Sequence, residues 1–176
     1  MASETYGDKV FGMNDLKVTH ISGSPQEDVL GAQSLTMKPV LKGGILEGDD
    51  ADIAAHYFVT RMEGEFSAGS YSSAAVGIML GITLTATGTT PNEITTLKIN
   101  AAQRMPYFKV YGKALDDSTG DMHILLAKCK LTDIEAFKME NGNWRITKAS
   151  ILALDDGTNG IVRAIQNETA AAVPAT

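Results

Sequence analysis

Short segments in which apolar and polar residues alternate are the feature of this sequence that most limits its possible folds. Alternation with a period of two, interrupted by Gly, Asp, Asn and Pro turns, is typical of antiparallel β structure. In the second half of the chain it predicts a series of sequential hairpins with strands at Tyr107–Leu115, Met122–Leu131, Asp133–Met139, Trp144–Leu154 and Ile161–Gln166. Asn141–Gly142 predicts a type I′ turn between the third and fourth of these strands.

The first half of the chain has longer connections between its expected strands. Strands are expected at Leu16–Ile21, Ser34–Leu41, within Ile53–Phe66, and at Ile94–Ile99. Long loops are expected at Ser22–Asp28 and Lys42–Asp50. Ser72 and Gly81 bracket an apolar segment with the residue types that begin and end helices, and therefore predict one short helix between them.

The length of 176 residues is that of one domain with one core. We expect an N-terminal arm at residues 1–14, a single domain at 15–168 and a flexible C-terminal tail at 169–176. The expected fold is mainly β, an antiparallel β-sandwich or barrel with one short flanking α-helix and long loops.

Composition and charge disfavour several classes of protein. The net charge of −6 has the wrong sign for tight binding to nucleic acid. No apolar run is long enough to cross a membrane, and the N-terminus does not resemble a secretory signal, so the chain is expected to stay where it is made. The single cysteine, Cys129, cannot form an internal disulfide.

Sequence signatures of catalysis and of cofactor binding are also missing. There is no glycine-rich phosphate loop, nucleophile elbow or pair of histidines at metal-ligand spacing. The acidic run of Glu47, Asp49, Asp50 and Asp52 is the best metal candidate, but it lacks the spacing of a calcium loop, and a solvated turn or an interface lip explains it better. We therefore expect no enzyme activity, no cofactor and no resident metal.

The strand at Met122–Leu131 has apolar residues on both faces. Either a bulge switches the two faces, or a neighbouring subunit covers the second one. Under the second interpretation, the candidates for a subunit interface are Leu125, Ala127, Cys129 and Leu131.

The order of these elements resembles the major tail tube proteins of bacteriophages with long, non-contractile tails. In residues 46–81 a long strand leads into a short helix that ends on Leu-Gly, and residues 107–131 hold two strands joined by an acidic turn. In residues 137–165 a hairpin precedes an apolar strand, a second acidic turn and a last strand. The resemblance spans most of the chain.

The resemblance implies a structural subunit that assembles into hexameric rings, which stack into a tube. An N-terminal arm or a long loop would reach the adjacent ring, and residues 1–14, 22–31 and 42–51 are long enough to do so. The implied partners are further copies of the chain, the tape measure, tail terminator and distal tail proteins, and DNA that passes without being held. The implied location is the virion tail, assembled in the cytoplasm of the bacterial host.

An acidic lumen would leave DNA free to slide, because both carry negative charge. The candidate lumen residues are Asp49, Asp50, Asp52, Glu63 and Glu65. The alternative is that these acids lie on the solvent-exposed outer face of the protein.

Two other functions fit the same fold class. One is a stand-alone β-sandwich binding module, such as a capsid decoration or carbohydrate-binding domain, and the other is a tube subunit of a contractile or secretion machine.

Overall fold

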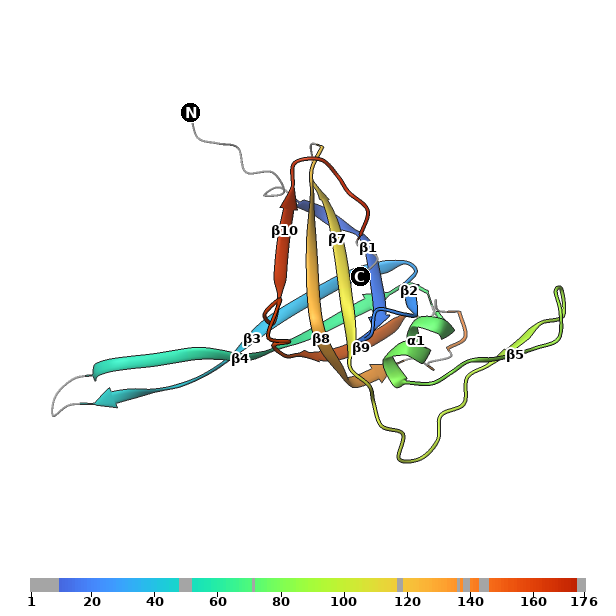
Figure 1. Ribbon diagram of the computed structural model, residues 1–176, viewed down its shortest axis with the longest axis horizontal. Coiled ribbons are helices and arrows are strands. Elements are labelled where there is room, and N and C mark those ends of the chain that lie inside the picture. The colour runs from blue at the N-terminus through green and yellow to red at the C-terminus, as the bar shows by residue number, and fades with distance from the viewer. Residues whose placement is uncertain are drawn as a thin grey trace.

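One antiparallel sheet and one short helix make up most of the structure, a computed structural model (Figure 1). It describes residues 10–47, 52–70, 72–116, 119–135, 137, 140–142 and 146–173. The elements are β1 (Val10–His20), β2 (Gln26–Asp28), β3 (Ala32–Glu47), β4 (Asp52–Ala68), α1 (Ser73–Leu80), β5 (Thr85–Thr87), β6 (Ile94–Thr96), β7 (Phe108–Asp116), β8 (Asp121–Glu135), β9 (Thr147–Ala153) and β10 (Arg163–Asn167). The predicted fold class, mainly β and antiparallel with one short helix, is confirmed.

The main sheet has the strand order β2-β1-β7-β8-β9-β4-β3. β10 pairs with the first part of β8, whereas β9 pairs with its last part. The sheet curls until β1 contacts β3, and the core lies inside this curve. β5 and β6 form a separate small hairpin that extends beyond the body (Figure 1).

The helix α1 covers the core beside β1, β2 and β8. Its ends lie where the sequence predicts, because Ser72 accepts a hydrogen bond from the Ala75 amide at 3.2 Å and Gly81 adopts the left-handed conformation with φ 69°. All its residues from Ala75 to Leu80 are buried. The helix therefore closes one side of the hydrophobic core and does not have the polar face of an amphipathic surface helix.

A bulge in β8 accounts for part of the apolar pattern on its two faces. Phe108 lies opposite Cys129 while Val110 lies opposite Leu126, so β8 has one more residue than β7 in this interval. Leu126 and Cys129 therefore both point into the core, although three positions separate them. A second irregularity, between Leu131 and Asp133, switches the faces again. The predicted bulge is observed, and it accounts for Cys129 and Leu131 but not for Leu125 and Ala127, which lie outside the core cluster.

Several predicted elements differ from the structure. Residues 10–14 of the predicted N-terminal arm begin β1, residues 1–9 lie outside the described residues, and Gln26–Asp28 of a predicted loop form β2. Residues 42–47, predicted as a loop, continue β3, and the predicted separate strand at Asp133–Met139 begins as the end of β8. Gly142 has φ 77°, but in the described part of the chain Ala102 is the single non-glycine residue with positive φ. A type I′ turn also needs positive φ at Asn141, so that turn type is not adopted.

Candidate assembly surface

A long two-stranded hairpin projects from the body of the protein (Figure 1). β9 pairs with β4 only between Met62 and Ala68, so the outer part of β4 has β3 as its strand partner. The boundary is a bulge at Thr60, whose hydroxyl donates a hydrogen bond to the carbonyl of Val40 at 3.1 Å. We call residues 41–47 and 52–59 the arm.

Large apolar side chains are exposed along the arm. Their exposed fractions lie between 47% and 61% for Leu41, Ile45, Leu46, Tyr57, Phe58 and Val59. An isolated two-stranded hairpin is marginally stable in water, and contiguous apolar surface of this kind usually marks a contact with another molecule. The arm is therefore the strongest candidate for an assembly element among the described residues.

A glycine fixes the local packing of the arm. Gly43 lies opposite Tyr57, and a Cβ atom on Gly43 would lie 1.9 Å from the His56 carbonyl oxygen and 2.8 Å from the Tyr57 ring. The backbone of β4 at His56 and the ring of Tyr57 thus occupy the space that a side chain at position 43 would need. A Cβ atom on the neighbouring Gly44 would meet no atom within 4 Å.

This difference predicts unequal effects of the same substitution. Gly43→Ala should push the two strands of the arm apart, at a cost of roughly 1–3 kcal/mol for forced overpacking, whereas Gly44→Ala should leave the arm intact. Chymotrypsin cleavage after Tyr57 or Phe58 reports the opening of the arm. We expect cleavage of Gly43→Ala to be about tenfold faster than that of Gly44→Ala. Equal cleavage rates would contradict the packing described above.

The acidic candidates for a lumen do not form one described cluster. Glu63 and Glu65 are exposed on the same face of β4. Glu63 pairs with Arg61 at 3.1 Å and lies opposite Lys38 in the register. Asp49 and Asp50 lie outside the described residues, and of Asp52 only the backbone position at the start of β4 is described.

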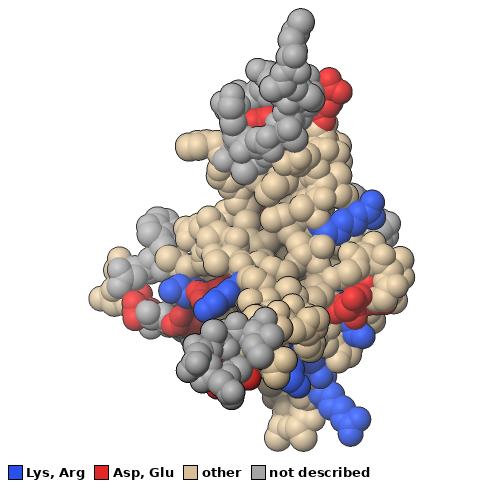
Figure 2. All heavy atoms as spheres, turned by 90° about the vertical axis from the view of Figure 1, so that its left-hand side faces the viewer, with Lys and Arg blue, Asp and Glu red and all other residues tan. Residues whose placement is uncertain are grey.

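The face seen in Figure 2 is likewise mixed in charge. Side chains of both signs lie interspersed on it, and uncharged surface separates them. On the described residues, the candidate lumen face is polar with charges of both signs rather than uniformly acidic.

The four candidates for a subunit interface are mostly covered within one copy. Cys129 and Leu131 belong to the core, and burial raises the pKa of the Cys129 thiol. Ala127 is buried, with an exposed fraction of 2%, and Leu125 is half-buried beside it. Leu125 and Ala127 line a shallow pocket together with Val173 from the C-terminal segment.

The C-terminal segment is held to the sheet by the carboxylate of Asp121. Asp121 is fully buried and accepts hydrogen bonds from the Asn167 side chain at 2.6 Å and from the Ala171 amide at 2.7 Å. Lys113 and His123 lie 3.1 and 3.0 Å from the same carboxylate. Lys113 also donates to the carbonyl of Ala171.

Residues 170–173, predicted as part of a flexible tail, are thus fixed to the body. The amide of Ala170 donates to the carbonyl of Thr119 at 2.8 Å, and Val173 is buried with an exposed fraction of 7%. The sequence did not predict this contact, because an Ala-rich segment has no polar side chains that would indicate binding to the body. Here its backbone groups make the contacts.

The environment of Asp121 predicts how the C-terminal segment responds to acid. Burial opposes the charged form, but hydrogen bonds from Asn167, Ala171, Lys113 and His123 outweigh burial and lower the pKa of Asp121 from 3.8 to about 2. Because the folded-state pKa is the lower one, the stabilisation is complete above pH 3.8 and is lost as the pH falls toward 2.

The NMR signal of the Ala171 amide should therefore titrate with a midpoint near pH 2, and Asp121→Asn should abolish that titration. The amide of Thr158, which donates to Asp156 at 2.9 Å in a distant turn, is an internal control whose titration should survive the substitution. A midpoint at or above pH 3.8 for Ala171 would mean that the carboxylate does not hold this segment.

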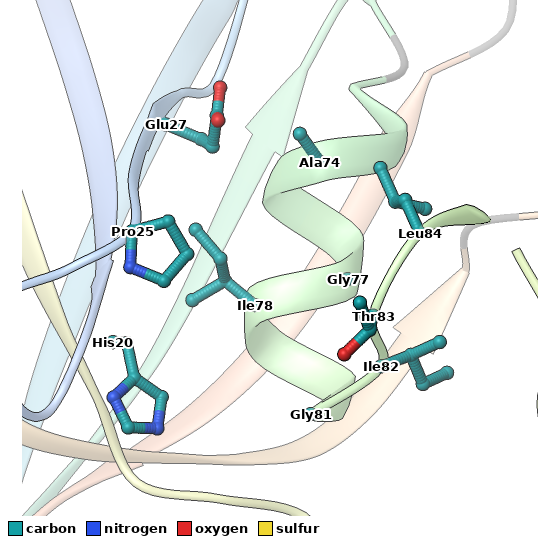
Figure 3. Close-up of a pocket in the computed structure, with 10 residues that line it drawn as sticks. All are labelled: His20, Pro25, Glu27, Ala74, Gly77, Ile78, Gly81, Ile82, Thr83 and Leu84. Carbon is teal, nitrogen blue, oxygen red and sulfur yellow. The ribbon is translucent and has the colours of Figure 1, made fainter. Parts of the chain in front are cut away.

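A groove runs between α1 and the connection from β1 to β2 (Figure 3). Pro25 faces Ile78 across it, and Ile82 and Leu84 follow the helix on the other side. Its titratable residues are His20 and Glu27. Ser22 lies 2.7 Å from Nδ1 of His20 and also donates to the Ser24 carbonyl at 3.2 Å, an arrangement that closes the local turn. The groove lining is otherwise mainly apolar.

Two further kinds of site are absent from the described residues. No group of three or more His, Cys, Asp or Glu side chains is placed to hold a metal ion in this part of the chain. No helix among the residues described is long and apolar enough to cross a membrane.

The chain is an antiparallel β protein with a projecting two-stranded hairpin. Comparison with known protein families found no family model that matches the chain, and comparison with curated proteins found no match either.

Proposed function

We propose that this protein is a structural subunit of a tail tube of a bacteriophage with a long, non-contractile tail. The observation that carries the proposal is the arm, a hairpin that projects from the body with six large apolar residues exposed. A protein that acted alone would gain nothing from this surface, because exposed apolar patches of this kind favour association. The order of elements that resembles the tail tube family supports the same conclusion.

In this proposal the subunits form hexameric rings, and the rings stack into a tube within the virion tail. The arm joins one ring to the next, and the curled sheet forms the wall. The function is physical and involves no covalent chemistry. DNA passes through the lumen without tight binding because the net charge of −6 opposes phosphate binding. Glu63 and Glu65 are the described candidates for the wall, and the tape measure, tail terminator and distal tail proteins are the proposed partners.

Electron microscopy of the purified protein at high concentration tests this proposal. We expect rings with sixfold symmetry and a central channel, with short stacks of rings in the same images. Uniform compact particles without a channel would contradict the proposal and would favour a stand-alone binding module. A second sample that contains the other tail proteins is the matched control. It tests whether the chain assembles only when a partner starts the assembly.

A further inference from the structure

Three lysines and a tyrosine lie on the outer face of the sheet, where β7 and β8 lie side by side. Phe108 and Cys129 are opposite each other and point into the core, so the residues that flank them point to the other face. The Nζ atoms of Lys128 and Lys130 lie 5.4 and 5.1 Å from the centre of the Tyr107 ring. We call Tyr107, Lys109, Lys128 and Lys130 the lysine patch.

The positive charges of the lysine patch have no acidic partner in the described part of the chain. The ion pairs found there use Lys17, Arg61, Lys113 and His123 instead. The Tyr107 ring stabilises two of the ammonium groups through its π face, but it does not neutralise them. In a chain with a net charge of −6, a local excess of three positive charges is a distinct surface feature.

The end of the arm has the opposite excess of charge. Glu47 and Asp52 are paired in the backbone register between β3 and β4, and both residues are acidic. The sequence between them adds two more acids and no base. The seven residues of β3 within the arm extend it by about 20 Å, away from the body that carries the patch (Figure 1).

We propose that the lysine patch of one copy receives the acidic end of the arm of a second copy. This inference rests on the proposed function, and it identifies the surface on which the arm docks. Charge complementarity carries it, because the patch contributes three lysines and the sequence of the arm end contributes four acids. Nucleic acid is the other polyanion that could occupy the patch, and the net negative charge of the chain disfavours it.

A charge-swap experiment tests this docking. Lys128→Glu combined with Lys130→Glu should raise the protein concentration needed for assembly by about tenfold or more, as measured by sedimentation velocity. Glu47→Lys combined with Asp52→Lys should have a similar effect, and the four substitutions together should restore assembly.

Lys98→Glu combined with Arg104→Glu is the matched control. It makes the same change of net charge as the double lysine variant at exposed positions elsewhere, and it should leave assembly unchanged. Lys128→Gln with Lys130→Gln repeats the test with a milder change, and circular dichroism checks the fold of each variant.

The outcomes separate failure of this docking from failure of the proposed function. If the wild type forms rings and the Lys128 and Lys130 variants assemble as it does, the arm docks elsewhere and the tube proposal stands. If the wild type forms no rings with or without tail partners, the tube proposal itself fails. Fluorescence anisotropy with a single-stranded oligonucleotide gives the third outcome. Binding that the lysine variants abolish while assembly is unchanged would assign the patch to nucleic acid and overturn the docking.

Discussion

Removal of the arm should abolish assembly while the body still folds. Leu41 and Val59 are opposite each other in the register, so an Asn-Gly turn can join them in place of residues 42–58. The deletion removes no residue of the core. Because the arm carries most of the exposed large apolar side chains of the hairpin, we expect at least about a hundredfold weaker association by sedimentation velocity.

Two comparisons make this result interpretable. Thermal unfolding of the deletion variant should remain cooperative, which shows that the body is intact. A second deletion that shortens the small hairpin between β5 and β6 is the matched control, since that hairpin also extends from the body (Figure 1). Association of the arm-deletion variant at the strength of the wild type would show that the copies join through another surface.

Replacement of Asp121 should cause the largest loss of stability of any single substitution considered. Asp121→Ala would leave Lys113 and His123, with side-chain exposed fractions of 13% and 7%, without the buried carboxylate that they share. Removal of one partner from a buried charge cluster costs roughly 3 kcal/mol or more. Urea unfolding should report this loss, and proteolysis should show release of residues 167–173.

Asp156→Ala is the matched control for Asp121. The pKa of Asp156 is also lowered to about 2, by hydrogen bonds from the side chain and backbone of Asn159 and from the backbone of Thr158. Asp156 lies in an exposed turn and orders that turn alone, so its removal should change the free energy of unfolding much less than that of Asp121. Equal losses for the two variants would mean that the buried cluster does not anchor the C-terminal segment.

Local signals in the sequence predicted the local features of this fold. Ser72 and Gly81 define the helix through contacts within a few residues, and the alternation around Phe108 and Leu126 predicts strands directly. The apolar pattern of Met122–Leu131 indicated a bulge as one of two explanations, but the position of the bulge depends on the partner strand and was not predictable. The pair Gly43–Gly44 reads as a loop, but in the folded chain the ring of Tyr57 fills the space beside the first of these glycines.

The candidate surfaces depend on residues that are far apart in the sequence. The carboxylate of Asp121 binds groups 46 and 50 positions away, and no sequence pattern connects them. The lysine patch likewise requires the register that places Tyr107 beside Lys128 and Lys130. The sequence shows that the end of the arm is acidic, but it does not show that the lysines of the patch lie on one surface.

Self-association is the central claim, and sedimentation velocity of the wild-type protein from one to tens of micromolar tests it most directly. We expect a species with six times the chain mass of 18.7 kDa, together with larger multiples of it as concentration rises. A protein that sediments as a monomer throughout this range, and also in the presence of the other tail proteins, would contradict the account.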